Sequence, residues 1–306
     1  MRAVVTGGAG FIGSHLVDSL VADGADVLVL DDLSHGSSAN LAAGAELAQL
    51  DVRDEDGVHK AVTGFGPDVL FHFAAQIDVR KSIAAPAADT AVNVLGSVHV
   101  FSAALAAGVR RVVNTSTGGA IYGETDVVPT PETVPAEPLS PYGLSKRAVE
   151  RYGAWFRSHH GLDLVTLRYG NVYGPRQDPR GDAGVIAIFC DKVLAGQRPT
   201  VFGDGRQTRD YVFVGDIVAA NRAVAVAADL PHDVYNIGTG TEVDVLTLAA
   251  AVAAAAGVDP ADFAPHLQPA RPGEVLRSCL DVSRARAELG LRAPTDLTDG
   301  LRATLD

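Results

Sequence analysis

A chain of 306 residues can bury one large hydrophobic core or two closely joined ones. Its net charge of −12 excludes a general binder of nucleic acids or anionic membranes, because phosphate surfaces attract clustered cations. The two cysteines, Cys190 and Cys279, stand apart from any CxxC motif or histidine cluster, so we expect buried, reduced thiols and no metal site.

The N-terminal segment predicts a βαβ unit. Arg2–Thr6 is a short β-branched run, Phe11–Ala22 carries apolar residues at helical spacing, and Asp26–Leu30 is a second apolar run. Further strands are predicted at Glu46–Leu50, Asp68–Phe73, Arg111–Asn114 and Leu164–Arg168, with helical segments between most of them. Because these strands are apolar throughout, the sequence predicts an α/β fold with a doubly wound parallel sheet buried on both faces. The binding crevice is then expected at the carboxyl ends of the strands.

The chain shows neither a charged-then-apolar leader nor a long uncharged span, and Met1 leads directly into the first strand. We therefore expect a cytoplasmic protein that enters no membrane.

A glycine-rich turn follows the first strand. Gly7, Gly10 and Gly13 are spaced as GxxGxxG, with Phe11 and Ile12 between the last two glycines. Glycines permit a tight turn, close approach of a pyrophosphate and close packing of the next helix, whose N-terminus faces the anion. A glycine-rich turn without a ligand is the alternative, but the strand before it and the helix after it favour a dinucleotide site.

Acidic residues follow the second and third strands. Asp31 ends the second strand about 20 residues after the glycines, where a carboxylate accepts hydrogen bonds from an adenosine ribose. A 2′-phosphate would be repelled by Asp31 and Asp32, so the sequence favours NAD over NADP. The alternative for either carboxylate is a solvated turn. Asp51 and Val52 are candidates to border the adenine, although Asp51 could equally cap a helix.

Tyr142 and Lys146 are the candidate catalytic pair. Ser140 and Pro141 predict an N-cap and a first-turn proline for a helix running toward Gly161. Residues four apart share one helix face, so the ammonium can lie beside the phenol. A free tyrosine has a pKa of about 10, so a base active near neutrality needs positive charge from Lys146 and the nicotinamide. The alternative, an exposed tyrosine with a solvated lysine, is disfavoured by the glycine motif in the same half of the chain.

Thr115-Ser116-Thr117 lies just past a predicted strand end. Thr117 is the candidate to hydrogen-bond the reacting hydroxyl, and Ser116 is a neighbour with a structural role. For either residue the alternative is a helix cap or a loop tie.

After Arg168 the sequence becomes rich in glycine and proline, which predicts a smaller C-terminal α/β lobe. We assign residues 1–170 to a cofactor domain and 171–306 to a substrate lobe. Residues 210–237 are expected to rejoin the first domain, because Asp210–Val214 and Val234–Ile237 are further strand candidates.

Together these motifs resemble the extended short-chain dehydrogenase/reductase superfamily, and within it the NAD-dependent nucleotide-sugar epimerases and dehydratases, with the UDP-glucose 4-epimerases as the best match. The resemblance covers nearly the whole chain and implies a Rossmann fold with NAD as cofactor. It implies that Tyr142 is the base, that Lys146 binds the nicotinamide ribose and assists the tyrosine, and that Thr117 contacts the sugar hydroxyl. It also implies that Phe73, Ala74, Ala75 and Asn93 line the cofactor crevice.

The segment after Thr117 bears on the type of reaction. The related 4,6-dehydratases carry an Asp-Glu pair there and decarboxylases have a Glu nearby, whereas this chain has Gly118-Gly119-Ala120. The resemblance then implies 4-epimerisation of a UDP-hexose, by transient oxidation at carbon 4 and return of the hydride to the opposite face.

By the same resemblance, residues of the second lobe contact the substrate. Asn171 matches a sugar and diphosphate contact, Arg209 and Arg271 match diphosphate-binding arginines, and Glu274 matches a nucleotide-ribose contact. Phe202 is a candidate to pack on the base, although an isolated phenylalanine is more often in a core. Ser278 occupies the position where a bulky aromatic residue restricts some epimerases, so UDP-N-acetylhexosamines are also candidate substrates.

Other functions stay open at this point. Epimerases acting on UDP-glucuronate carry an arginine shortly after the YGPRQ motif, where this chain has Asp178 after Gln177, although Arg180, Arg80 or Lys81 could substitute. A non-catalytic NAD sensor or scaffold usually has a damaged YxxxK or glycine motif, and both are intact here. A reductase that releases oxidised cofactor is a third possibility, and the choice between UDP and dTDP rests on resemblance alone. Resemblance also implies a homodimer through the helices Asn93–Gly108 and Tyr142–His160.

Overall fold

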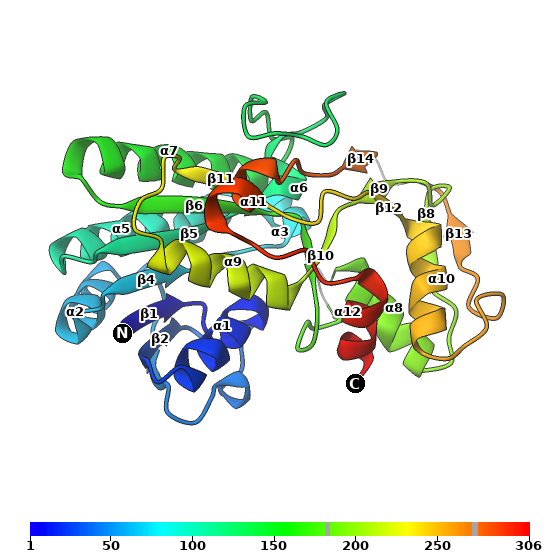
Figure 1. Cartoon of the computed structure of the whole chain (residues 1–306), viewed down its shortest axis with the longest axis horizontal. Helices are drawn as coiled ribbons and strands as arrows, with labels where there is room; N and C mark the ends of the chain where they lie inside the picture. The colour runs from blue at the N-terminus through cyan, green and yellow to red at the C-terminus, as the bar shows by residue number, and fades with distance from the viewer. Residues whose placement is uncertain (181–183, 271–274) are drawn as a thin grey trace.

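The computed structural model describes residues 1–180, 184–270 and 275–306, and its centre is a seven-stranded sheet (Figure 1). Its strands are β1 (Arg2–Thr6), β2 (Asp26–Asp31), β3 (Glu46–Gln49), β4 (Val69–His72), β5 (Arg111–Thr117), β6 (Leu164–Tyr169) and β11 (Val234–Ile237). All neighbouring strands are parallel, in the order β11-β6-β5-β4-β1-β2-β3. The order reverses between β1 and β4, and ligands of such sheets bind at this point, beyond the carboxyl ends of the strands. The predicted doubly wound α/β fold is confirmed.

Helices cover both faces of the sheet. On one face α1 (Phe11–Ala22) lies beside α9 (Val214–Val226), and on the other face α2 (Glu55–Phe65) and α7 (Pro141–His160) flank α5 (Gly96–Ala106) (Figure 1). Alternate residues of one strand enter the two cores, as Val5 and Val4 do. Burial on both faces therefore explains why these strands are apolar throughout.

Short helical elements occupy the connections near the carboxyl edge. They are η1 (Ser38–Asn40), α3 (Val79–Ala84), α4 (Pro86–Thr90), the π-helical turn η2 (Ala91–Leu95) and α6 (Gly118–Ile121). Asp78 caps α3 by accepting hydrogen bonds from two backbone N–H groups of its first turn. Gly161 ends α7 in the left-handed conformation, with a φ of +69°.

Among the described residues, the C-terminal part contains three small sheets and a third core. The strand sets are β7 (Asn171–Tyr173) with β10 (Tyr211–Phe213), β8 (Thr200–Phe202) with β13 (His266–Gln268), and β9 (Thr208–Arg209) between β12 (Val243–Asp244) and β14 (Arg277–Ser278). The helices are α8 (Val185–Leu194), α10 (Val245–Ala255), α11 (Ser283–Leu289) and α12 (Leu297–Leu305). Phe189, Leu248 and Leu301 pack together in the third core, from α8, α10 and α12. Figure 1 shows this lobe beside the large sheet.

Two strand predictions have different outcomes. Val234–Ile237 forms β11, which pairs with β6 in the large sheet as expected. The expectation that Asp210–Val214 also returns to that sheet is wrong, because β10 pairs with β7 in a separate two-stranded sheet. The following helix α9 nevertheless packs against α1 and β5, so the chain crosses between the two parts more than once. Cys190 and Cys279 are both buried and free, as predicted.

Membrane-spanning helices and metal-binding clusters are both lacking in the described part of the chain. No helix there combines the length and apolar character needed to cross a bilayer. No three His, Cys, Asp or Glu side chains there are grouped so as to hold a metal ion.

Candidate active site

The glycine turn between β1 and α1 is packed too tightly for side chains. Gly7 has a φ of +68°, and a Cβ atom on it would lie 2.6 Å from the backbone nitrogen of Ala74. A Cβ atom on Gly13 would lie 2.3 Å from the carbonyl oxygen of Gly7. Gly10 precedes the helix in extended conformation, and the half-buried residues 11–12 open its first turn, where backbone N–H groups have no intrahelical partner. Such a cradle fits a pyrophosphate.

Asp31 is fixed beside this turn. Its carboxylate accepts hydrogen bonds from the backbone nitrogens of Ala9 and Leu33, both at 2.9 Å, and the residue is 7% exposed. Each carboxylate oxygen keeps a second lone pair, which can accept a ribose hydroxyl. The solvated-turn alternative is therefore wrong for Asp31, whereas it describes Asp32, which is exposed and accepts from the Ser34 backbone.

Asp51 and Val52 follow β3. Asp51 forms an ion pair with Arg53, with 2.5 Å between Oδ2 and Nη2. This contact holds the pKa of the Asp51 carboxyl below its usual range. Asp54 is the residue that caps α2, so the helix-cap alternative for Asp51 is wrong. Val52 is buried against α5, where a Cβ atom on Gly96 would lie 2.6 Å from Val52 Cγ2.

The half-buried segment Phe73-Ala74-Ala75 is bonded to the last residue of β1. The backbone nitrogen of Phe73 donates to the Thr6 carbonyl oxygen at 3.0 Å, and that of Ala74 donates to Thr6 Oγ1 at 3.2 Å. This segment therefore forms the wall of the glycine turn on the β4 side.

A buried histidine extends this bonding toward η2. His72 Nδ1 lies 2.7 Å from Thr6 Oγ1, and Nε2 lies 2.8 Å from Ser97 Oγ. Because the Ser97 hydroxyl donates to the carbonyl oxygen of Asn93, Nε2 of His72 is the protonated nitrogen and Nδ1 accepts. Burial lowers the pKa of His72 to about 3, so the ring stays neutral at physiological pH.

Helix α7 places Tyr142 and Lys146 in its first turns. Ser140 Oγ caps the helix at 3.2 Å, as predicted, and the backbone nitrogen of Tyr142 donates to Ser82 Oγ at 3.1 Å. Lys146 Nζ donates to the carbonyl oxygen of Thr115 at 3.0 Å and lies 6.0 Å from the centre of the Tyr142 ring. Lys146 is only 7% exposed and Tyr142 is half-buried, so the solvated-lysine alternative is wrong.

The charge on Lys146 depends on its surroundings. Burial lowers the pKa of the ammonium to about 8, and the carboxylates of Asp89 and Glu150 act in the opposite direction. Asp89 is 1% exposed, and its Oδ1 accepts from Asn93 Nδ2 at 3.1 Å. The same amide lies 3.1 Å from Ser145 Oγ, which joins η2 to α7. Asp89 lies one helical turn before Asn93, but no sequence pattern marked it as functional.

The carboxyl end of β5 completes this region. The strand continues through Thr117, so the expectation that residues 115–117 follow its end is wrong. Ser116 Oγ donates to Glu150 Oε1 at 2.7 Å, which is the structural role foreseen for it. Thr117 Oγ1 accepts from the Ala120 backbone at 3.2 Å and so caps α6, while its hydroxyl hydrogen can still be donated to a ligand.

A buried ion pair lies behind the catalytic candidates. Arg168 Nη2 and Glu150 Oε2 are 2.6 Å apart, with a second contact of 2.9 Å between Nε and Oε1. Arg168 Nη1 also donates to the Tyr122 hydroxyl at 2.7 Å. These contacts lock α7 to β6 and α6.

Three substrate candidates lie close together. A Cβ atom on Gly119 would lie 3.5 Å from Asn171 Oδ1 and 4.0 Å from Ser278 Oγ. Ser278 on β14 is the register partner of Arg209 on β9, and both are half-buried. Phe202 is half-buried at the end of β8. Arg271 and Glu274 lie outside the described residues.

Asp210 is a further buried carboxylate near the substrate candidates, and no sequence motif pointed to a role for it. It is 1% exposed, and its Oδ1 accepts from the nitrogen and the hydroxyl of Thr239 at 2.7 and 2.6 Å. Its Oδ2 accepts from the backbone nitrogens of Gly240 and Leu280 at 3.1 and 3.3 Å. One carboxylate thus joins the strand end next to Arg209 to two other loops.

Comparisons with known proteins agree with this geometry. The family model described as "NAD dependent epimerase/dehydratase family" matches residues 3–238. The UDP-glucose 4-epimerase of Mycolicibacterium smegmatis is 45% identical over 311 residues, covering 100% of this chain and 98% of the relative. The solved UDP-glucose 4-epimerase of Thermotoga maritima with UDP-glucose is 42% identical with a TM-score of 0.95, covering 100% and 97% of the two chains. The Thermus thermophilus enzyme in complex with NAD is 43% identical with a TM-score of 0.92, covering 100% and 98%.

Proposed function

Because the chain belongs to the NAD dependent epimerase/dehydratase family, we propose that it interconverts UDP-glucose and UDP-galactose by NAD-dependent 4-epimerisation. The observation that carries this proposal is the buried Lys146 beside Tyr142, at the same sheet edge as a glycine cradle that fits a dinucleotide. The absence of acidic residues at Gly118-Gly119-Ala120 supports epimerisation over elimination of water.

Each protein group has one task in this reaction. NAD, held by the glycine cradle and Asp31, would supply the hydride acceptor and donor for carbon 4 of the sugar. Tyr142 takes the proton of the 4-hydroxyl as the carbonyl forms, and gives it back when the carbonyl is reduced. Lys146, oriented by the Thr115 carbonyl, stabilises the phenolate. Thr117 donates a hydrogen bond to the reacting oxygen. No net proton or hydride is consumed.

The cofactor residues we propose begin with the cradle Gly7, Gly10 and Gly13 and the ribose acceptor Asp31. Residues 73–75 and Asn93 form the side of the crevice next to Tyr142 and Lys146. The hydrogen bonds that Ala74 donates to Thr6 and Asn93 donates to Ser145 support this arrangement, because they fix both segments against the proposed site. Residues 1–170 with α9 and β11 form the cofactor domain in this proposal, and the other residues after 170, including β10, form the substrate lobe.

We propose that the substrate binds around Asn171, Arg209 and Ser278, and that Phe202 packs on the base of the nucleotide. Asn171 and Ser278 both approach Gly119, which supports a common sugar pocket. Neither Gly119 nor Ser278 carries a bulky side chain, so the pocket is proposed to accept N-acetylated sugars as well as neutral hexoses. Arg271 and Glu274 are kept as diphosphate and ribose contacts on resemblance alone.

The test is Tyr142→Phe on purified protein, assayed with UDP-galactose. We expect retained NAD and UDP binding with turnover reduced by orders of magnitude, because the variant cannot accept the proton. Tyr152→Phe is the matched control on the same helix, and its turnover should equal that of the unchanged protein. Turnover of Tyr142→Phe close to that of the control would remove Tyr142 from its role.

A substrate panel tests the sugar. UDP-galactose, UDP-N-acetylgalactosamine and UDP-galacturonate should be compared at equal concentration by kcat/KM. We expect turnover of the first two, and a dominant rate with UDP-galacturonate would replace the neutral-sugar proposal with the uronate one.

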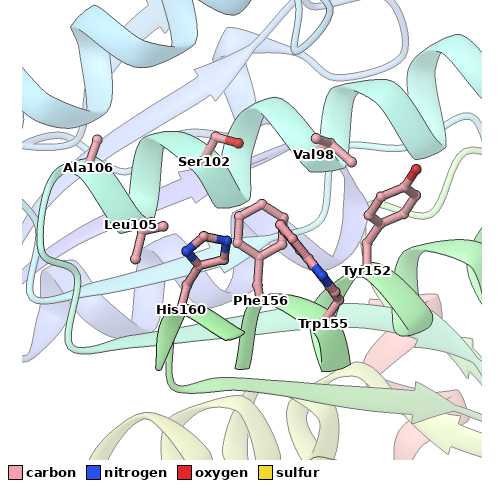
Figure 2. A pocket seen from close by; sticks show the side chains of 8 residues that line it. All are labelled: Val98, Ser102, Leu105, Ala106, Tyr152, Trp155, Phe156 and His160. Carbon is pink, nitrogen blue, oxygen red and sulfur yellow. The ribbon is translucent and has the colours of Figure 1, made fainter. Parts of the chain in front are cut away.

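We also propose a homodimer. Figure 2 shows side chains of α5 and α7 around a mainly apolar hollow, lined by Val98, Ser102, Leu105, Ala106, Tyr152, Trp155, Phe156 and His160. Trp155 is 45% exposed and Leu144, on the same helix, is 56% exposed, which is typical of a surface covered by a partner. Light scattering should give twice the monomer mass. Trp155→Glu should dissociate the dimer, and Leu194→Glu, at an exposed leucine of α8, is the matched control.

A further inference from the structure

Arg176 has a backbone conformation that needs an explanation. It lies in the loop after β7 and has a φ of +66°, one of two non-glycine residues with positive φ in the described part of the chain. This region is unfavourable for a residue with a Cβ atom, and such residues persist where surrounding contacts hold them. The contacts that hold Arg176 all lead to the cofactor side of the molecule.

The guanidinium of Arg176 bonds to α1, the helix that follows the glycine turn. Nη1 donates to Ser14 Oγ at 3.1 Å, and Nη2 pairs with Asp18 Oδ2 at 2.5 Å. Ser14 is fully buried and donates to the Phe11 carbonyl oxygen at 3.1 Å, so the contact reaches the first turn of the helix. Next to Arg176, the Pro175 carbonyl oxygen accepts from His15 Nε2 at 2.9 Å.

The same guanidinium reaches the segment after β2. Nη1 lies 3.4 Å from the carbonyl oxygen of Asn40. Asn40 Nδ2 and the backbone nitrogen of Ser37 both donate to the Ala9 carbonyl oxygen, each at 3.0 Å. A Cβ atom on Gly36 would lie 2.8 Å from the Ala9 carbonyl carbon, so this segment is packed directly on the glycine turn.

These contacts surround the adenosine half of the proposed cofactor site. Ala9 lies within the glycine turn and Asp31 is the proposed ribose acceptor, so the segment between Asp31 and Asn40 borders the ribose. Movement of this segment away from Ala9 would open the site at that end. Arg176, which lies in the loop that directly follows β7, opposes this movement through its contact with Asn40.

We propose that Arg176 is a positioning residue that retains NAD, by locking the loop after β7 onto the glycine turn and the segment at residues 36–40. An epimerase that returns the hydride it has removed needs the same cofactor in both half-reactions. This reason for retaining NAD rests on the proposed function, but the retention itself does not. NAD content is measured without turnover. Failure of the retention proposal can therefore be distinguished from failure of the proposed epimerase activity.

The chain offers a matched control at the other end of α1. Arg222 on α9 donates to Ser19 Oγ and pairs with Asp23, so it also fastens α1 to a distant part of the chain. Both of these contacts lie in the second half of α1 or just beyond it, away from the glycine turn and the segment at residues 36–40. An effect that arises only from loosening α1 should therefore be the same for Arg176→Ala and Arg222→Ala.

The experiment measures bound NAD and its dissociation rate. Unchanged protein, Arg176→Ala, Arg176→Gly and Arg222→Ala are purified identically, saturated with NAD and passed through gel filtration. Bound NAD is then quantified after denaturation, and its release is followed by exchange with etheno-NAD. Arg176→Gly removes the side chain while allowing the positive φ, so it separates loss of the contacts from backbone strain.

We expect both Arg176 variants to release NAD at least tenfold faster, and Arg222→Ala to match the unchanged protein. A dissociation rate of Arg176→Gly within twofold of the unchanged protein would overturn the proposal. Equal acceleration in Arg222→Ala would also overturn it, because the effect would then come from general loosening of α1.

Discussion

Replacing Asp89 by asparagine should change the pH dependence of catalysis without disturbing the fold. Asp89 Oδ1 accepts from Gln76 Nε2 at 2.9 Å and from Asn93 at 3.1 Å, and an amide oxygen can keep both bonds. Asp89 Oδ2 is buried and has no hydrogen-bond partner in the described part of the chain, so an NH₂ group there breaks none. The substitution therefore removes one negative charge near Lys146 and little else.

The magnitude follows from Coulomb's law. Two unit charges in contact at about 4 Å interact by about 4 kcal/mol at an effective dielectric constant of 20, and charges twice as far apart by about 2 kcal/mol, which is roughly 1.5 pKa units. Lys146 is faced by Asp89 from α4, by Glu150 from its own helix and by the neutral His72 from β4. Its pKa of about 8 should thus fall to roughly 6.5 in Asp89→Asn. The ammonium then loses its proton at lower pH than before.

The assay is kcat at saturating substrate and NAD between pH 5.5 and 9. At pH 7.5 a group with a pKa of about 8 is roughly three-quarters protonated, and one with a pKa of about 6.5 roughly one-tenth. We expect an approximately eightfold loss of kcat at that pH, and rates that converge with the unchanged protein at the acid end. Asp78→Asn, at the buried cap of α3, is the matched control. The alkaline limb of the kcat–pH profile should move to lower pH in Asp89→Asn only. A limb that stays in place in Asp89→Asn, or that moves equally in Asp78→Asn, would refute the reasoning.

Three further expectations concern buried polar groups. Glu150→Gln leaves Arg168 buried without its counter-charge, so the free energy of unfolding should fall by about 3 to 5 kcal/mol; a urea midpoint equal to that of unchanged protein would contradict this. His72 has a pKa of about 3 when folded and about 6.5 when unfolded, so only the unfolded chain gains this proton as pH falls through 6.5. Stability should drop by about 2 kcal/mol between pH 7.5 and 5, and urea titrations of His72→Gln should show a shallower dependence. Asp210→Asn should raise KM for UDP-galactose more than it lowers kcat, because the bonds to Gly240 and Leu280 are lost; an unchanged KM would separate Asp210 from the substrate lobe.

The sequence was a good guide wherever one residue type is dictated by local geometry. The glycine turn, the N-cap at Ser140 and the alternation of strands and helices all depend on neighbours within a few residues. These features were sufficient to predict the fold class and the placement of Tyr142 and Lys146 on one helix. The strand that ends at Thr117 was predicted too short, because Thr115 and Ser116 are polar and their pairing with β6 cannot be read from composition.

The sequence was a poor guide wherever a role depends on contacts between distant residues. Asp210–Val214 looks like any apolar strand, and its pairing with β7 rather than the large sheet is decided by the path of the chain between them. Arg176 contacts α1 across more than 150 residues, so no local pattern marks it. Asp89 was missed because an isolated aspartate in an alanine-rich segment is usually solvated.

The buried charges around α7 share a further property. Lys146 and Arg168 are cations, Glu150 and Asp89 are anions, and each of the four residues is at most 8% exposed. Burial of a single charge is costly, whereas two charges of each sign leave this cluster neutral overall. The site can therefore keep Lys146 protonated in a low-dielectric setting, where its charge acts on a phenolate more strongly than it would in water. Asp89 and Glu150, which both raise the pKa of Lys146, therefore oppose the effect of burial and help to keep a cation beside Tyr142.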